Sequence, residues 1–158
     1  MSRCRVRQKL ERWRALAGGE RRLLVELALF LPAIGTALRL FGVRRTCRLL
    51  GGSRQFAEGG IAVDEMAQAT AKRLGRLVNI ASRHGPYNAT CLRHSLALWW
   101  LLRRRGLPAE LHIGVGKEEA LVRAHAWVEL GGLVVNDRPS IAGDYAVYQG
   151  LERRLPGS

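Results

Sequence analysis

Residues 91–105 read CLRHSLALWWLLRRR, and the middle of this stretch, LALWWLL at 96–102, is apolar on every side of a helix. A helix that is hydrophobic all round is buried rather than half exposed. Thr90 is a suitable N-cap for it, the arginines at 103–105 suit the C-terminal end of the helix dipole, and Gly106 ends it. The sequence therefore predicts a buried helix over 91–105.

Alternating segments follow this helix. Residues 109–115 and 121–130 place apolar side chains at every second position, which is typical of strands. Gly131-Gly132 is a hairpin signal, and 133–136 is the expected return strand. Before the buried helix, residues 61–82 show helical spacing, which His84-Gly85-Pro86 ends. This order predicts an α+β fold in which the buried helix packs on a small antiparallel sheet.

The length of 158 residues fits one domain, but its charge is uneven. The chain has 26 Lys+Arg and 13 Asp+Glu, and residues 1–50 alone hold twelve of the basic residues and three glutamates, a net of +9. Glycines at 51, 52, 59 and 60 indicate a linker over 51–60. We therefore expect a basic helical N-terminal region over 1–55 and a second unit over 56–158.

The longest apolar stretch, 23–41, is a candidate for membrane contact. Glu26, Pro32 and Arg39 interrupt it, which leaves it short of the roughly 20 residues that a span requires. We expect a buried or surface-lying helix pair that is broken near 32–35. The basic flanks would also suit peripheral contact with an anionic membrane face, as a second interpretation.

Cys91 stands in the first turn of the predicted buried helix, where unpaired N–H groups and the positive end of the dipole stabilise a thiolate. A nucleophilic cysteine needs a base, for which His125 is the candidate, and a group that orients the base. That group is Asn136 if Gly131-Gly132 forms a two-residue turn, and Asp137 if the loop has three residues. A register shift of one residue moves each side chain to the other face.

Several segments together resemble one family. They are CLRHSLAL at 91–98, LLRRRG at 101–106, IGV at 113–115, AHAWVE at 124–129 and ND at 136–137. In combination they resemble the transglutaminase-like cysteine peptidase of lasso-peptide biosynthesis, the enzyme that removes the leader from the precursor. The resemblance covers about 91–137, while His-Ala-Trp alone occurs across all transglutaminase-like proteins.

The resemblance implies a papain/transglutaminase-like core, with 56–158 as the peptidase domain. It implies Cys91 as nucleophile, His125 as base and Asp137 as orienting acid, which favours the three-residue loop. The reaction is then acyl transfer through a thioacyl-enzyme, with no metal and no cofactor. The backbone N–H of Cys91 is one expected oxyanion donor, and Asn88 is a candidate for the second.

The resemblance also implies partners. Residues 1–60 show no alternating strand pattern, so the leader-recognition domain that some members carry is expected to be absent. We therefore expect a separate leader-recognition (PqqD-like) protein, a lasso precursor peptide as substrate, and the ATP-dependent lasso cyclase that closes the macrolactam. Three cysteines without a CxxC pair indicate a reducing, cytoplasmic setting.

Two other function classes compete with the peptidase. Another transglutaminase-like acyl transferase would use the same three residues and pass the acyl group to an amine. A basic module that binds nucleic acid or a membrane surface is suggested by the net charge of +13. The chain has no recognisable nucleic-acid-binding fold or aromatic stacking platform, so no nucleic-acid partner is expected.

Overall fold

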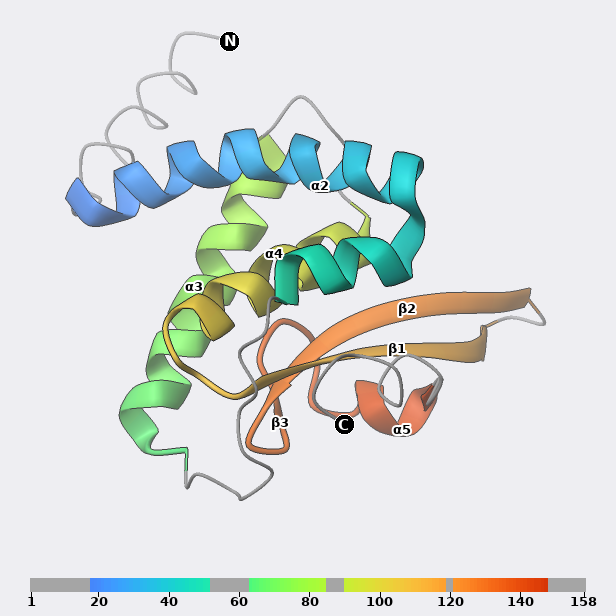
Figure 1. Cartoon of the computed structure of the whole chain (residues 1–158). Coiled ribbons are helices and arrows are strands. Elements are labelled where there is room, and N and C mark those ends of the chain that lie inside the picture. The colour runs from blue at the N-terminus through green and yellow to red at the C-terminus, as the bar shows by residue number, and fades with distance from the viewer. Residues whose placement is uncertain (1–17, 52–62, 85–89, 119–120, 148–158) are drawn as a thin grey trace, which may run out of the picture.

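The computed structural model describes residues 18–51, 63–84, 90–118 and 121–147, in which helices cover one face of a small sheet (Figure 1). The helices are α2 (Gly18–Gly51), α3 (Glu65–His84), α4 (Cys91–Arg104) and the short α5 (Ile141–Asp144). The strands are β1 (Ala109–Glu118), β2 (Leu121–Leu130), β3 (Leu133–Val134) and β4 (Ala146–Val147). Their order in the sheet is β3-β2-β1-β4, and all pairs are antiparallel. The predicted α+β fold is confirmed.

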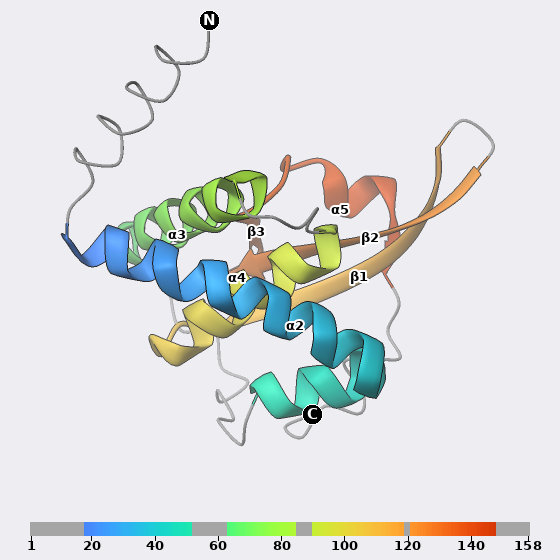
Figure 2. The same ribbon diagram turned by 90° about the horizontal axis from the view of Figure 1, so that it is seen from above.

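The helix α4 lies at the centre of the hydrophobic core, as its sequence predicts. Seen from above, it runs between α2 and α3 and over the sheet (Figure 2). Its residues Leu96, Leu98 and Leu102 are fully buried. The indole N–H of Trp99 donates a hydrogen bond to the backbone oxygen of Ala109 at 3.0 Å. The last turns of α4 are therefore tied to the first residue of β1.

The sheet has two different faces, because side chains alternate along a strand. Ala109 pairs with Leu130 and Leu111 with Val128, and all four side chains are buried in the same core as the helices. The intervening residues of both strands project to the opposite face, on which α5 lies (Figure 1). The core-facing side fixes the fold, and the other side is available for the site.

The start of one helix differs slightly from the predicted one. The helix α3 begins at Glu65 rather than near 61, because the Asp64 carboxylate accepts a hydrogen bond from the backbone N–H of Ala67 at 2.7 Å and caps the helix there. The expected linker over 51–60 lies almost wholly outside the described residues. The division into 1–55 and 56–158 stays a prediction.

The predicted helix pair is present in α2, but its break is not where the sequence suggested. Pro32 lies inside the helix, and its carbonyl accepts a hydrogen bond from the Thr36 hydroxyl at 3.1 Å. The break is at Gly42, whose φ of 71° and ψ of 173° suit only glycine. The buried Thr46 hydroxyl donates to the Gly42 carbonyl at 2.8 Å and so stabilises the first turn of the returning segment.

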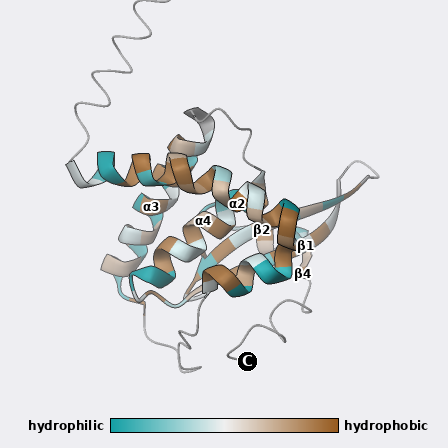
Figure 3. Cartoon of the chain, turned by 45° about the horizontal axis from the view of Figure 1, so that its top comes forward, coloured by the Kyte–Doolittle hydropathy of each residue, from teal (hydrophilic) through white to brown (hydrophobic). Residues whose placement is uncertain are grey.

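The length and apolar composition of α2 would also allow it to cross a membrane. A core helix of a globular protein meets the same criterion, and α2 buries Leu23, Leu27 and Ile34 in the core. Most of the first part of α2 is coloured as hydrophobic in Figure 3. Several of its apolar side chains are exposed, namely Val25, Leu29, Leu40, Phe41 and Leu49. Membrane contact stays a prediction.

Candidate active site

Cys91 is the first residue of α4, and its thiol is free and half buried. The preceding Thr90 has the extended backbone of an N-cap residue, and its carbonyl accepts the first helical hydrogen bond from His94 N at 3.2 Å. The Thr90 side chain makes no capping hydrogen bond, so it takes none of the N–H groups of the first turn. The thiol therefore lies beside backbone donors that its own helix leaves unused.

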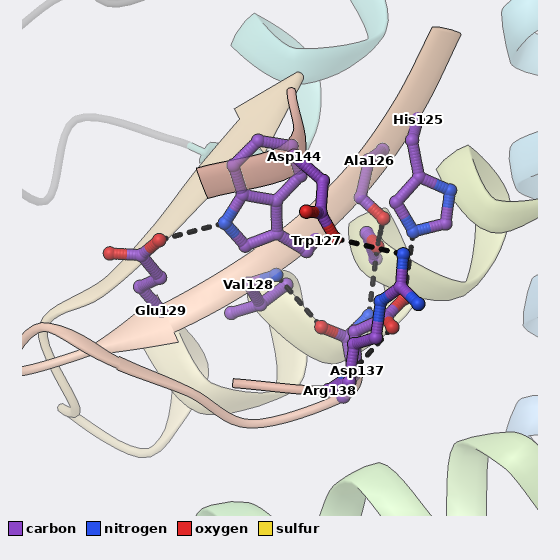
Figure 4. A network of polar contacts seen from close by, with 10 residues as sticks. His125, Ala126, Trp127, Val128, Glu129, Asp137, Arg138 and Asp144 are labelled. Carbon is purple, nitrogen blue, oxygen red and sulfur yellow. Dashed lines mark hydrogen bonds and ion pairs between the residues drawn. The ribbon is translucent and has the colours of Figure 1, made fainter. Parts of the chain in front are cut away.

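His125 and Asp137 form the central contact of the site. The Nε2 atom of His125 lies 2.7 Å from Oδ2 of Asp137, and the two side chains keep 23% and 28% of their surface exposed. The other carboxylate oxygen of Asp137 accepts the backbone N–H of Arg138 at 2.8 Å, which fixes the carboxylate (Figure 4). A carboxylate on Nε2 favours the tautomer that carries its proton there. The Nδ1 atom is then left as the basic nitrogen of the ring.

The turn that leads to Asp137 differs from the predicted one. Leu130 pairs with Leu133, so the loop is a two-residue turn, and both Gly131 and Gly132 have positive φ angles, of 58° and 76°. The expected three-residue loop is therefore wrong. The rule that a two-residue turn would direct Asp137 away from His125 is wrong as well.

The reason is that β3 leaves the ladder early, after Val134 rather than at 136. The Val135 N–H still donates to Val128 O at 3.0 Å. The Val135 carbonyl, however, faces α3, where a Cβ added to Gly75 would lie 3.0 Å from it. The chain bends at residues 135–137, so the alternation of a pleated strand no longer determines where the Asp137 side chain points.

Asn136 has a different position from the orienting role considered for it. Its Oδ1 accepts the Val128 N–H at 2.8 Å, in place of the displaced Val135 carbonyl. Its Nδ2 donates to the Ser95 hydroxyl at 2.9 Å, and that hydroxyl donates to Ala126 O at 2.8 Å. Asn136 therefore joins β2 to α4 rather than orienting His125.

This connection also orients the helix that carries the candidate nucleophile. Ser95 lies one helical turn after Cys91, and residues four apart share a face of a helix. Because Ser95 bonds to the carbonyl of the residue that follows His125, the face of α4 that carries Cys91 is directed to the strand that carries His125. The structure thus brings His125 and Asp137 together, and it joins α4 to β2 one helical turn after Cys91. Asn88 lies outside the described residues.

Two aromatic rings enclose the imidazole of His125. The Trp127 ring is stacked with it at a centroid distance of 6.4 Å and an interplanar angle of 17°, and the Tyr145 ring lies at 5.3 Å. Gly114 pairs directly with His125 across the ladder. A Cβ at this glycine would lie 2.8 Å from Tyr145 Cβ and 3.0 Å from the Trp127 ring, so only glycine leaves room for both rings.

Sequence reasoning missed Tyr145 and the role of Gly114. Nothing in the local pattern of residues 141–147 indicates that Tyr145 returns to His125. Its place follows from the pairing of the next two residues with β1, where Val115 pairs with Ala146 and Gly114 with Val147. One feature of the sequence could have indicated the close approach at Gly114, because a glycine inside an alternating strand often marks such a site.

The other titratable groups show no second site in the part of the chain that the structure describes. No group of three or more His, Cys, Asp or Glu residues there could hold a metal ion. Cys47 is fully buried, and desolvation raises the pKa of its thiol from 9.0 to about 11, which keeps it protonated at neutral pH. Of the two described cysteines, Cys91 is the accessible one.

Comparison with known proteins identifies the family. The profile of the transglutaminase-like superfamily matches residues 36–149, which includes every residue of the site described above. The chain belongs to the transglutaminase-like superfamily. It is also 38% identical over 61 residues to the microcin J25-processing protein McjB of Escherichia coli, a stretch that covers 39% of this chain and 28% of that protein. Both similarities confirm the family resemblance predicted from residues 91–137. No solved structure gives a significant match.

Proposed function

We propose that this transglutaminase-like protein is a cysteine endopeptidase that removes the leader from a lasso-peptide precursor in the cytoplasm. The observation that carries the proposal is the 2.7 Å contact of His125 with Asp137, next to the residue of β2 to which Ser95 of α4 is joined. The similarity to a protein described as processing microcin J25 supports the class of substrate. Family membership supports a cysteine-dependent acyl-transfer reaction.

The first half of the reaction acylates the thiol. The Nδ1 atom of His125 takes the proton of the Cys91 thiol, and the thiolate attacks the carbonyl carbon at the leader–core junction. The oxyanion that forms is stabilised by the Cys91 backbone N–H at the start of α4. His125 then donates the proton to the leaving amine of the core peptide, the C–N bond breaks, and the leader remains as a thioester on Cys91.

The second half of the reaction releases the leader. A water molecule gives a proton to His125 and adds to the thioester carbonyl, and the C–S bond then breaks to free the leader carboxylate and the thiol. Asp137 keeps the imidazole oriented and stabilises its cationic form in both halves. The rings of Trp127 and Tyr145 limit the access of water to the imidazole, which favours the hydrogen bond with Asp137.

The partners proposed for this reaction follow from the family resemblance. A separate leader-recognition (PqqD-like) protein would present the precursor, and the ATP-dependent lasso cyclase would close the macrolactam on the freed core. The matched stretch covers less than a third of McjB, so these partners are tested together with the activity.

The test is mass spectrometry of a precursor peptide incubated with this protein and the leader-recognition protein. We expect cleavage at one bond, abolished by Cys91→Ala and lowered about 100-fold or more by Asp137→Asn. Cys47→Ala is the matched control, since it removes the buried thiol and leaves Cys91 in place. An intact precursor in the presence of all folded components would contradict the proposal.

A parallel reaction with an added primary amine separates hydrolysis from transfer. A peptidase releases the leader with a free carboxylate whether or not the amine is present. If the leader mass instead increases by that of the amine minus water, with the same dependence on Cys91, the protein is an acyl transferase.

A further inference from the structure

We propose that Glu129 is a positioning residue for the site, because it holds the Trp127 ring against which the His125 imidazole is stacked. The inference rests on the proposed function in one respect, since it assumes that His125 acts on the Cys91 thiol. It adds to that function a residue four positions from the proposed base that contacts neither the thiol nor Asp137 in the described hydrogen bonds.

The alternation of β2 places His125, Trp127 and Glu129 on one face of the sheet, opposite to the face that packs on α4. The indole Nε1 of Trp127 donates to Oε1 of Glu129 at 2.7 Å (Figure 4). At its other end the same indole is stacked with the imidazole. The three side chains thus form a row that runs from the carboxylate through the indole to the imidazole.

The burial of Trp127 shows that the ring needs this acceptor. Its exposed fraction is 0%, yet it is absent from the cluster of residues that forms the hydrophobic core. A buried indole N–H without an acceptor is unfavourable, so the hydrogen bond to Glu129 determines the ring orientation that the structure can keep. The buried ring therefore packs on the face of the sheet that carries His125, not in the hydrophobic core.

A carboxylate at position 129 is otherwise an unfavourable choice. Glu129 pairs directly with Glu110 on β1, and like charges directly opposite each other destabilise a sheet. His112 lies between them, with Nε2 at 3.7 Å from Glu129 Oε2 and 3.4 Å from Glu110 Oε2. His112 pairs with Trp127 across the ladder, and its ring is stacked with the indole at a centroid distance of 5.7 Å. Glu129 thus has two partners on this face, and its contact with the indole, at 2.7 Å, is the shorter one.

The Trp127 ring is closely surrounded, so its position depends on the hydrogen bond with Glu129. The space above Gly114 is filled by Trp127 and Tyr145, whose ring centroids are 6.3 Å apart. The indole is in contact with the imidazole and with Tyr145, so we expect a shift of the indole that loses its acceptor to move the His125 imidazole relative to Asp137. The effect of Glu129 would then reach the thiol through the tryptophan.

The test uses a reaction of the thiol that needs no peptide substrate. The pH dependence of Cys91 alkylation by iodoacetamide is followed by mass spectrometry of the peptide that contains Cys91, so that the other cysteines do not contribute. Thiolate formation at Cys91 depends on the orientation of the imidazole, so a displaced His125 lowers the alkylation rate at neutral pH. Asp137→Asn gives the reference profile for a misoriented base.

We expect Glu129→Leu to lower the alkylation rate at pH 7 about tenfold and to move the profile toward that of Asp137→Asn. Glu129→Gln keeps an oxygen acceptor and should retain the rate within about threefold. Glu110→Gln is the matched control, because it removes the same charge from the same face without contacting Trp127. Trp127→Phe removes the N–H, and adding Glu129→Leu to it should lower the rate no further.

Three results would overturn the inference. They are an unchanged profile in Glu129→Leu or Trp127→Phe, a Glu129→Gln rate as low as that of Glu129→Leu, and effects of the two substitutions that multiply in the double variant. If Glu129→Leu does not fold, Glu129→Gln and Trp127→Phe decide the question by the same criteria. If the wild-type thiol is activated by His125 but the precursor stays intact, the proposed substrate fails while this inference stands.

Discussion

Replacing Asn136 by alanine tests whether the hydrogen bonds of this side chain hold the site together. The amide accepts the Val128 N–H and donates to the Ser95 hydroxyl. Val128 and Ser95 are both 0% exposed, so water cannot easily replace either partner. Asn136→Ala would leave a buried backbone donor without an acceptor, and it would remove one hydrogen bond to Ser95 of α4, whose own bond to Ala126 O remains.

The size of the effect follows from these two contacts. An unsatisfied buried N–H costs about 1–3 kcal/mol, and the loss of the second hydrogen bond adds about 1 kcal/mol, so we expect a destabilisation of about 2–4 kcal/mol. At about 2–4 °C per kcal/mol for a chain of this size, the Tm should fall by about 5–15 °C. Asn136→Asp keeps the acceptor for Val128 but loses the donor to Ser95, and it should cost about half as much.

The assay is urea unfolding followed by circular dichroism, together with the alkylation rate of Cys91 in the folded variant. Asp137→Asn is the companion variant, since its half-exposed side chain should change the unfolding free energy by less than about 1 kcal/mol while it lowers the rate. A change below about 0.5 kcal/mol in Asn136→Ala would refute the reasoning. So would an additive effect in the double variant Ser95→Ala/Asn136→Ala, because residues that share a hydrogen bond should couple.

Three further predictions concern Cys47, Gly114 and Gly42. Burial raises the pKa of Cys47 from 9.0 to about 11, so the folded state holds this proton more tightly than the unfolded state. The contribution of this group to the free energy of unfolding is therefore fully present below pH 9 and is lost as the pH rises to about 11. Urea unfolding at pH 8–11 should show this fall in the wild type, and a weaker one in Cys47→Ala. Gly114→Ala places a methyl group 3.0 Å from the Trp127 ring and should cost about 1–3 kcal/mol while slowing Cys91 alkylation. Gly42→Ala meets no neighbouring atom but keeps a φ of 71°, so it should cost about 1–3 kcal/mol by thermal unfolding, whereas Gly143→Ala, with neither constraint, should cost less than about 0.5 kcal/mol.

The elements with strong periodicity could be predicted from the sequence. The alternation over 121–130 gives β2 with its observed bounds, and the apolar stretch from Cys91 gives α4 to within one residue. These segments follow from local patterns because one face, or every face, of each is buried in the core. The contact of His125 with Asp137 was predicted as a residue pair through the family resemblance, not from the turn geometry.

The features that could not be predicted depend on contacts between distant segments. The position of Asp137 depends on the Val135 carbonyl, which faces Gly75 of α3, and on the Asn136 amide that replaces it in the ladder. A pattern of residues along one strand contains neither contact. The break in α2 was predicted near Pro32, because proline disfavours a helix interior. The helix accommodates Pro32, however, and the chain breaks at Gly42, whose backbone conformation suits only glycine.

The two faces of β2 divide the evolutionary constraints on this strand. Ala126, Val128 and Leu130 are buried on the face toward α4, so substitutions there act on its packing, and so chiefly on how much folded protein a cell accumulates. On the proposed function, substitutions at His125 and Glu129, whose side chains are partly exposed, act chiefly on the chemistry of molecules that are already folded. A complete mutational scan can score the abundance of the protein and its turnover separately. The effects of substitutions on each score should then alternate along β2 with a period of two residues, and the positions that affect one score should lie between those that affect the other. Lineages could then adjust thermal tolerance through one set of positions while leaving the reacting groups unchanged.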